Sequence, residues 1–330
     1  MASIWLVGLV VVTALAFDYI NGFHDTANSI ATTVLTGALS IPMAIFLAAS
    51  LNFVGAFMNE AVANTIGKGI VDPHAVTLSA VWAALLGAII WNLITWWKGL
   101  PSSSSHALIG GIVGAVVARH GFSVFHMAGL KLVGLALLIS PFLGFVIGQL
   151  FMVSILWVFR RAQPTRLNRY FKVIQVFSAA SMAISHGSND AQKTMGIITM
   201  ALASGGYLPS FHVPLWVIVV CAGAMATGTA AGGWRIIKTV GRKVISLQPV
   251  HGFAAETAGA AVIFAASSLG APVSTTHVIS SSIMGVGSAQ KMKGVRWNIV
   301  RQIVSAWILT LPVAALLSGI ISWILIPIMG

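Results

Sequence analysis

The octapeptide Gly-Phe-His-Asp-Thr-Ala-Asn-Ser at residues 22–29 is echoed by Gly-Ser-Asn-Asp-Ala-Gln-Lys-Thr at residues 187–194. Two further echoes exist. Pro-Ser-Ser-Ser-Ser-His at 101–106 matches Pro-Val-Ser-Thr-Thr-His at 272–277, and Thr-Ile-Gly-Lys at 65–68 matches Thr-Val-Gly-Arg at 239–242. Matching segments at similar displacements indicate that the chain is two copies of one unit. We therefore divide it into a first repeat (1–159), a basic linker (160–172) and a second repeat (173–330).

The composition places both repeats in a membrane. Of 330 residues, 58% are hydrophobic and 7% are charged, and the mean hydropathy is +0.95. Apolar segments of membrane-spanning length recur without the alternation of a β-barrel, so we predict an all-α polytopic membrane protein. The longest polar interruption, about 160–172, is too short for a soluble catalytic domain. The single cysteine, Cys221, excludes an intrachain disulfide and a thiolate metal cluster.

The positions of the basic residues predict the orientation of the chain. Most Lys and Arg residues fall in three short blocks between apolar segments: the linker, 235–243 and 291–301. This is the positive-inside pattern of a protein in the cell membrane, and it argues against nucleic-acid binding. We expect the three blocks on the cytoplasmic side, both termini outside, and three or five crossings in each half. Loop 61–74, the counterpart of the basic loop 233–249, is nearly neutral, so the two repeats are expected to be inverted.

Each repeat is expected to contain broken or re-entrant helices. The polar octapeptides predict helix breaks near residues 24 and 189, and the Ser/Thr-His segments predict either two-crossing hairpins or re-entrant pairs. Pro141 and Pro312 predict kinks or helix ends in the last apolar stretch of each repeat. Inverted repeats with broken helices are typical of secondary transporters, whose binding site lies near the midplane of the bilayer.

The acidic residues are the first candidates for function. Five of the six lie within or at the edge of apolar segments, where a charged carboxylate costs about 2.5–3.5 kcal/mol on insertion scales. They are Asp18, Asp25, Glu60, Asp190 and Glu256. Asp25 and Asp190 occupy matching positions in the repeats, where they cap helices, bind ions or do both. Asp18 lacks a counterpart, and a structural bond to a neighbouring helix is as good an interpretation as a function.

The two Ser/Thr-His segments predict an anion site. Each places three hydroxyl groups and free backbone N–H groups at the start of a helix, where a tetrahedral oxyanion is favoured. The hydroxyl residues are Ser103, Ser104 and Ser105 in the first repeat and Ser274, Thr275 and Thr276 in the second. Hydroxyl side chains also cap helices and pack between membrane helices. His106 and His277, which follow, are ligands, proton relays or satisfied residues at a helix start.

An anion site beside carboxylates requires a cation. Asp25 and Asp190 would repel phosphate or sulfate unless protons, sodium or a divalent metal compensate their charge, which predicts symport. Lys193 follows Asp190 by about one helical turn, so its ammonium group either pairs with Asp190 or contacts the anion.

At this point the residues resemble a known family. The paired octapeptides and the Ser/Thr-His segments, together with Gly-Gly-Trp-Arg-Ile-Ile-Lys-Thr-Val-Gly (232–241) and Gly-Phe-Ala-Ala-Glu-Thr (252–257), are similar to the duplicated signature of the inorganic phosphate transporter family. The resemblance covers both halves and implies a homodimeric secondary carrier that moves orthophosphate with a cation. It implies a substrate and cation site at Asp25, Asn28, Asn189, Asp190, Gln192 and the six hydroxyl residues. It also implies that Glu60 and Glu256 take part in transport.

Two departures from the family's commonest Asn-Asp-x-x-Asn pattern concern the cation. His24 replaces the first Asn of the first copy, and Lys193 replaces the last Asn of the second. An ammonium group cannot ligate Na⁺ and an imidazole does so poorly, whereas both can move protons or offset phosphate charge. We therefore predict proton coupling rather than sodium coupling, with phosphate or a neutral metal–phosphate complex as the cargo. The predicted coupling residues are Asp25, Asp190, Glu60, Glu256 and His24.

Three alternatives are separated by chemistry. A sulfate permease would use the same donors, but sulfate at neutral pH cannot donate a hydrogen bond to Asp25 or Asp190. An intramembrane hydrolase is disfavoured because Ser105 and His106 are sequence neighbours, which diverge by about 100° on a helix. We therefore expect no enzyme and no resident cofactor. A channel would not need carboxylates that trap a co-ion.

The basic linker is a topology signal, or it also docks an accessory cytoplasmic protein or acidic lipids.

Overall fold

Helices make up the architecture of the computed structural model, which describes residues 3–232, 247–290 and 295–329. The described elements are α1 (Ile4–Leu35), α2 (Ile41–Gly55), α3 (Ala61–Asn64), the π-helical turn η1 (Thr65–Gly69), α4 (Leu78–Lys98), α5 (Ser104–His120), α6 (Met127–Val158), α7 (Pro164–Ser204), α8 (Leu215–Ala231), α10 (Pro249–Ser268), α11 (Thr275–Gln290) and α12 (Trp297–Met329). Five of them, α1, α4, α6, α10 and α12, are long and apolar enough to cross a membrane. The prediction of an all-α polytopic membrane protein is confirmed. The echo at 239–242 and the basic block at 235–243 lie outside the described residues.

The two Ser/Thr-His segments fold as matching helical hairpins. In the first, α4 ends at Gly99, whose φ of 63° favours glycine, and Ser103 caps α5 by accepting the N–H of His106. In the second, Gly270 has a φ of 69° just after α10, and Ser274 accepts the N–H of His277. We call residues 99–103 the first turn and residues 269–274 the second turn.

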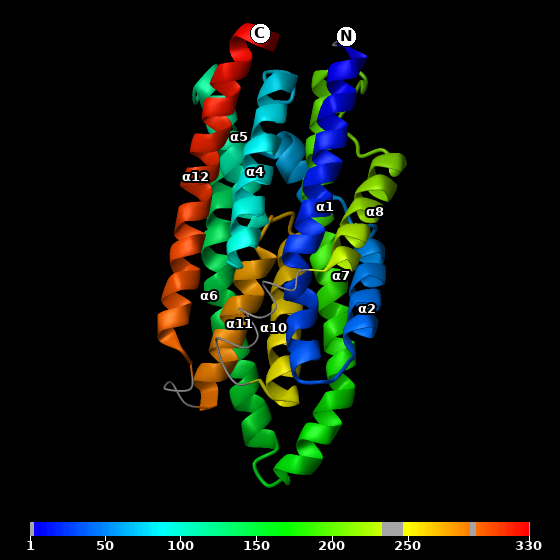
Figure 1. The fold of residues 1–330 in the computed structure, drawn as a ribbon, viewed down its shortest axis with the longest axis vertical. Coiled ribbons are helices and arrows are strands. Elements are labelled where there is room, and N and C mark those ends of the chain that lie inside the picture. The colour runs from blue at the N-terminus through cyan, green and yellow to red at the C-terminus, as the bar shows by residue number, and fades with distance from the viewer. Residues whose placement is uncertain (1–2, 233–246, 291–294, 330) are drawn as a thin grey trace.

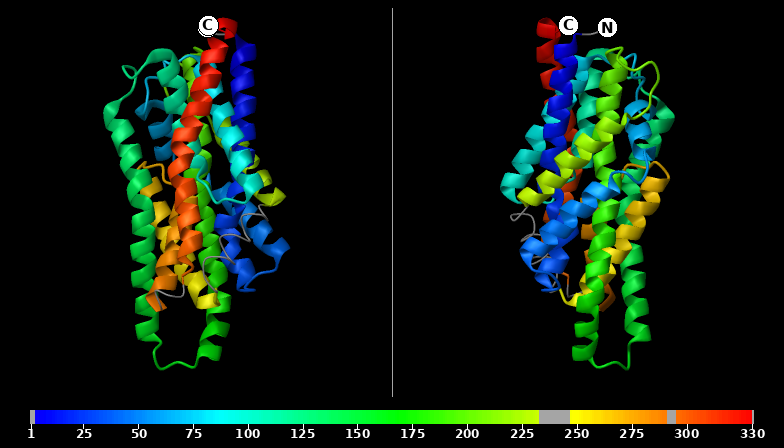
Figure 2. Two further views of the ribbon diagram at one scale, coloured as in Figure 1. Left: turned by 60° about the vertical axis from the view of Figure 1, so that its left-hand side comes forward. Right: turned by 90° about the vertical axis from the view of Figure 1, so that its right-hand side faces the viewer.

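The hairpins enter the molecule from opposite ends. Helices α4 and α5 lie in the half that holds both termini, whereas α10 and α11 lie in the half nearer the connection between α6 and α7 (Figure 1). Both turns therefore lie near mid-height, as the two further views also show (Figure 2). In the first repeat, α1 and α6 extend through both halves of the molecule, whereas the α4–α5 hairpin stays in one half (Figure 1). The number of membrane crossings in each half, three or five, stays a prediction.

The last helix of each repeat packs on the hairpin of the other repeat. Helix α12 packs against α5, and α6 packs against α11. A second reciprocal arrangement joins α1 to α8 and α7 to α2. This reciprocity is compatible with the predicted inverted repeat, whose internal symmetry stays a prediction.

The predicted helix breaks near residues 24 and 189 are wrong. Helix α1 continues from Ile4 to Leu35 and α7 from Pro164 to Ser204. The polar residues recur at helical spacing, so their side chains reach one face of the helix while the backbone hydrogen bonds stay intact. Pro141 and Pro312 likewise lie inside α6 and α12 and do not end them. Residues 164–172 of the predicted linker belong to α7.

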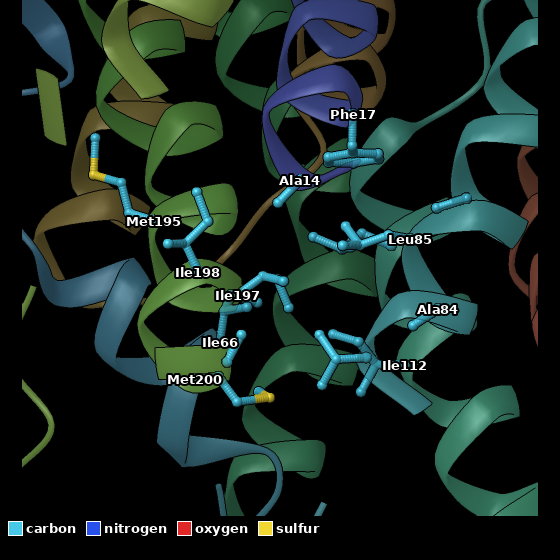
Figure 3. Close-up of a cluster of buried hydrophobic side chains, with 14 of the residues drawn as sticks. Ala14, Phe17, Ile66, Ala84, Leu85, Ile112, Met195, Ile197, Ile198 and Met200 are labelled. Atoms are coloured by element: carbon cyan, nitrogen blue, oxygen red, sulfur yellow. The ribbon is translucent and has the colours of Figure 1, made fainter. Parts of the chain in front are cut away.

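Two apolar clusters lie on either side of a layer of buried polar residues, which we call the polar layer. One, in the half with the termini, includes Phe17, Leu85, Ile112 and Ile198 (Figure 3). The other lies in the opposite half and joins α1, α2, α7, α10, α11 and the ends of α6 and α12. Along α1 the first cluster ends at Phe17 and the second begins at Ala27, so the polar residues between them lie at the junction of the two clusters.

Candidate functional site

All twelve predicted phosphate-site residues are buried in the polar layer or beside it. They come from α1, α7 and the starts of α5 and α11, so both repeats and both hairpins contribute. They are Asp25, Asn28, Ser103, Ser104, Ser105, Asn189, Asp190, Gln192, Lys193, Ser274, Thr275 and Thr276. Their burial in a largely apolar molecule indicates that polar partners must be supplied within the layer.

Asp25 on α1 contacts both hairpins. Its Oδ2 atom accepts a hydrogen bond of 2.8 Å from the hydroxyl of Ser104 in α5. Its Oδ1 atom accepts one of 3.2 Å from Thr276 in α11 and lies 2.6 Å from Nδ1 of His24. Asn28 donates a 2.9 Å hydrogen bond to the same Thr276 hydroxyl. One carboxylate therefore connects the two helix starts.

Asp190 on α7 forms the matching cluster. The ammonium group of Lys193 lies 2.5 Å from its Oδ1 atom, and Thr275 donates a 3.1 Å hydrogen bond to its Oδ2 atom. The same ammonium group donates to the hydroxyl of Ser105 at 2.5 Å and to the carbonyl of Val273 at 2.9 Å. This cluster also connects both hairpins.

The two clusters meet at a third residue, His186. One ligand atom each from Asp25, His186 and Asp190 lie within 4.8 Å of one another. The Nε2 atom of His186 is 3.5 Å from Asp190, and its Nδ1 atom is 3.2 Å from Oδ1 of Asn52. Two carboxylates and an imidazole can hold a proton or a divalent cation. This set draws one carboxylate from each repeat.

A hydroxyl group and two histidines at the starts of α5 and α11 also hold the hairpins together. Ser105 donates a 3.0 Å hydrogen bond to the carbonyl of Val273, directly across the two turns. The rings of His106 and His277 are tilted by 33° with centroids 4.4 Å apart, and His277 stacks on Trp307 of α12 at 4.0 Å. These contacts assign the histidines to the interface between the hairpins.

Not every predicted site residue lies in the central layer. Gln192 caps α3: its Oε1 atom accepts the N–H groups of Val62 and Ala63 at 2.9 and 3.2 Å. Asn189 donates a 2.8 Å hydrogen bond to Ser267 at the end of α10. Glu60, at the start of α3, is exposed.

Glu256 occupies a separate buried site. Its carboxylate accepts hydrogen bonds from Thr32, from Thr33 at 2.7 Å, from Ser178 at 2.5 Å and from Gln175 at 3.2 Å. The threonines lie two helical turns beyond Asp25 on α1. The two glutamates that the resemblance groups together therefore have different surroundings.

Several residues of the site were not predicted. His186 lies four residues before Asp190, and Asn21 lies four residues before Asp25 and accepts a 2.6 Å hydrogen bond from Ser104. Thr95 of α4 lies 3.1 Å from Nε2 of His24. The i, i+4 spacing would have revealed the first two if both helices had been predicted as continuous.

Two opposed hairpins whose turns meet at a buried polar layer are typical of a membrane transport protein. Residues 21–318 match the model of the phosphate transporter family. A protein of Rhizobium meliloti (strain 1021) named "Probable low-affinity inorganic phosphate transporter" is 51% identical over 96% of this chain and 95% of its own length. A protein of the same name from Bacillus subtilis (strain 168) is 49% identical over 96% of each chain.

A solved structure of a sodium-dependent phosphate transporter has the same fold. It superposes with a TM-score of 0.88 at 25% identity and covers 99% of this chain and 100% of its own. The chain therefore belongs to the phosphate transporter family, whose members are transporters rather than enzymes.

Proposed function

We propose that this chain takes up inorganic phosphate across a cell membrane by alternating access, in symport with a proton. The observation that carries the proposal is the single buried layer in which hydroxyl groups from both hairpins meet carboxylates from both repeats. The family match supports phosphate as the cargo. The comparisons give sulfate no support, and excess sulfate that fails to compete with labelled phosphate would exclude it.

Phosphate would bind at the two helix starts. Ser104, Thr275 and Thr276 donate hydrogen bonds to carboxylates in the conformation described, and the same hydroxyls can rotate to donate to phosphate oxygens. Lys193 adds a positive charge, and it is the only buried Lys or Arg among the described residues. The N-termini of α5 and α11 add the positive ends of two helix dipoles. Asn28 would contribute its amide group.

The remaining predicted residues would position the site. Ser103 and Ser274 accept N–H groups of their own helices, and Ser105 joins the two turns. Gln192 holds α3 against α7. Asn189 fixes the end of α10.

The charge of the layer requires a cation to accompany phosphate. Asp25 and Asp190 together carry two negative charges, and Lys193 offsets one of them. Hydrogen phosphate would raise the negative charge further unless protons or a divalent metal entered with it. The ammonium group 2.5 Å from Asp190 already pairs with this carboxylate and cannot itself ligate Na⁺, which favours a proton or a neutral metal–phosphate complex over Na⁺.

The test is uptake of labelled phosphate into proteoliposomes under imposed pH or sodium gradients, with and without Mg²⁺. We expect a lower pH outside the vesicles to drive phosphate accumulation by the wild type. We expect either Asp25→Asn or Asp190→Asn to abolish this accumulation. Asp72→Asn is the matched control, because Asp72 lies in the loop before α4 and its side chain accepts the backbone N–H of His74, a bond that an asparagine oxygen can also accept. Uptake that needs a sodium gradient and ignores pH would refute proton coupling. Accumulation by both site variants would remove these carboxylates from the mechanism.

A further inference from the structure

Asp18 is a buried carboxylate outside the site described above. It lies on α1 two helical turns before Asp25, and its side chain is fully buried (0% exposed). The spacing of Asp18, Asn21 and Asp25 places all three on one face of α1. Asp18 therefore belongs to the same polar stripe, on the side nearer the termini.

The surroundings of Asp18 offer it little compensation. Neither carboxylate oxygen makes a hydrogen bond of normal length to any described residue, and the hydroxyl of Thr194 is likewise unpartnered. The polar side chains that face it are Thr194 of α7 and Asn21 of α1. The Oδ1 atom of Asn21 accepts from Ser104, so only the amide N–H groups of Asn21 can donate to Asp18.

The charged and titratable groups near Asp18 do not supply a counter-ion either. They are Asp190 and Lys193 of α7 and Cys221 of α8. The ammonium group of Lys193 is held by Asp190, Ser105 and Val273. The negative charge of Asp190 opposes a second one at Asp18.

An ionised carboxylate in such a position is costly. Membrane insertion scales assign about 2.5–3.5 kcal/mol to a charged residue at the centre of a helix, and the penalty grows where donors are missing. Glu256 shows the contrast, because four donors surround its carboxylate. Asp18, whose carboxylate oxygens accept no hydrogen bond of normal length, avoids this cost when it binds a proton.

We propose that Asp18 carries the coupling proton. The inference rests on the proposed proton symport and names the group that binds the proton. Asp18 holds the proton in the conformation described here. For uptake, it takes the proton from water on the outer side when the alternate conformation exposes this face of α1, and it releases the proton to water on the cytoplasmic side, leaving a carboxylate, as phosphate is delivered there. The repeat places Ala183 at the matching position of α7, so the second repeat supplies no equivalent group.

Asp18→Asn separates this role from a structural one, because asparagine imitates the protonated carboxyl group in shape and charge. Two assays in proteoliposomes are compared: phosphate exchange at equal pH on both sides, which requires no net proton movement, and accumulation driven by a pH gradient. We expect exchange to persist, with its pH dependence flattened, and accumulation to be lost. Asp18→Glu, which keeps a carboxyl group, is expected to accumulate phosphate. Asp72→Asn should leave both assays unchanged.

A parallel loss of exchange and accumulation in folded Asp18→Asn would assign Asp18 a structural role, and undiminished accumulation would also overturn the proposal. Infrared difference spectra of reconstituted wild type and Asp18→Asn test the bound proton without transport. We expect the wild type to show a protonated-carboxyl C=O band that the variant lacks, and identical spectra would overturn the proposal. A wild type that neither exchanges nor accumulates phosphate, yet shows this band, would refute the proposed function and leave the protonated site intact.

Discussion

Lys193 and Asp190 form a buried ion pair, so removing one charge leaves the other buried and unpaired. Lys193→Met leaves the Asp190 carboxylate without its cation, which costs about 3–5 kcal/mol for a buried pair. The double variant Asp190→Asn, Lys193→Met removes both charges and is expected to recover most of the loss. The free energy of unfolding in detergent micelles measures both effects. Lys131→Met, at an exposed position on α6, is the matched control and should be close to neutral.

If the double variant were as unstable as the single one, the hydrogen bonds of Lys193 to Ser105 and Val273 would matter more than its charge. Transport should stay absent in both variants, because the proposed phosphate site has lost its ammonium group. Recovery of stability without recovery of transport would separate folding from function at this position.

Glu256 and Glu60 differ in their surroundings, and their variants should differ in stability. Glu256→Ala removes the acceptor of four buried donors, of which Ser178 keeps the carbonyl of Gln175. Each of the other three costs roughly 1–3 kcal/mol. Glu60 is exposed, so Glu60→Ala should change the free energy of unfolding by no more than about 0.5 kcal/mol. Chemical denaturation of both variants in the same detergent tests the difference. Equal destabilisation would contradict the separate surroundings that the structure gives them.

The sequence predicted the residues of the central layer better than their roles. Asp25, Asp190, Lys193 and the hydroxyl residues were identified because charges and hydroxyl clusters are rare in apolar segments and recur in both repeats. Gln192 lies in the same octapeptide, yet its amide group caps α3, an element that is far from it in sequence. Such a long-range partner leaves no local signal in the sequence. His186 and Asn21 were missed because a predicted break concealed their i, i+4 relation to the aspartates.

At the scale of elements, two close helix crossings bring the aspartates together. Gly22 and Gly228 lie where α1 meets α8, and a Cβ atom on Gly228 would overlap the backbone of Tyr19. Gly187 and Gly55 form the corresponding crossing of α7 and α2. Small residues allow membrane helices to approach to backbone contact. Each crossing lies within one turn of the octapeptide in which Asp25 or Asp190 is found.

Gly228→Ala is therefore expected to force α8 away from α1. The overlap involves backbone atoms that cannot rotate away, and overpacking of this kind costs about 1–3 kcal/mol. Gly223→Ala on the same helix is the control, since a Cβ atom there meets nothing within 4 Å. Thermal unfolding of the two variants gives the comparison. A similar midpoint for both would show that the crossing can relax, whereas phosphate uptake lost in Gly228→Ala alone would connect the crossing to the site.

The continuity of α1 and α7 was predicted wrongly from the sequence. A polar octapeptide within an apolar stretch resembles a break, because transporters often unwind helices at their binding sites. In this chain the side chains of α1 and α7 supply the polar atoms, and the interruptions in the helices occur at the two turns. The hairpins were predictable from Pro and hydroxyl residues at the helix starts. Their depth was not, since hydropathy does not distinguish a re-entrant pair from two crossings.

At the scale of the whole molecule, the opposed hairpins define two halves with different linings. Each half contains an apolar cluster, and the cluster in the half with the termini includes Leu85 and Ile198 (Figure 3). In the opposite half, Glu256 and its four donors lie among α1, α7 and α10. A polar network hydrates at lower cost than an apolar cluster does. We therefore expect the half nearer the linker to open to water more readily.

The positions of the chain ends allow a test of the membrane topology. Both termini lie at one end of the molecule, and the turn before α7 lies at the other (Figure 1). The basic residues of the linker predict that the second end faces the cytoplasm. The single cysteine, Cys221, is buried, so Cys221→Ser provides a background for new labelling sites. Ser3→Cys and Gln163→Cys place exposed thiols at the two ends.

A maleimide that cannot cross membranes should label Ser3→Cys in intact cells and Gln163→Cys only after the cells are opened. The reverse pattern would keep the fold and invert its orientation, so that the positive-inside prediction would be wrong for this chain. Labelling of both thiols from one side would instead contradict the odd number of crossings per repeat. In that case α1 and α7 would run in the same direction, and Asp25 and Asp190 could not approach the midplane on helices of opposite polarity.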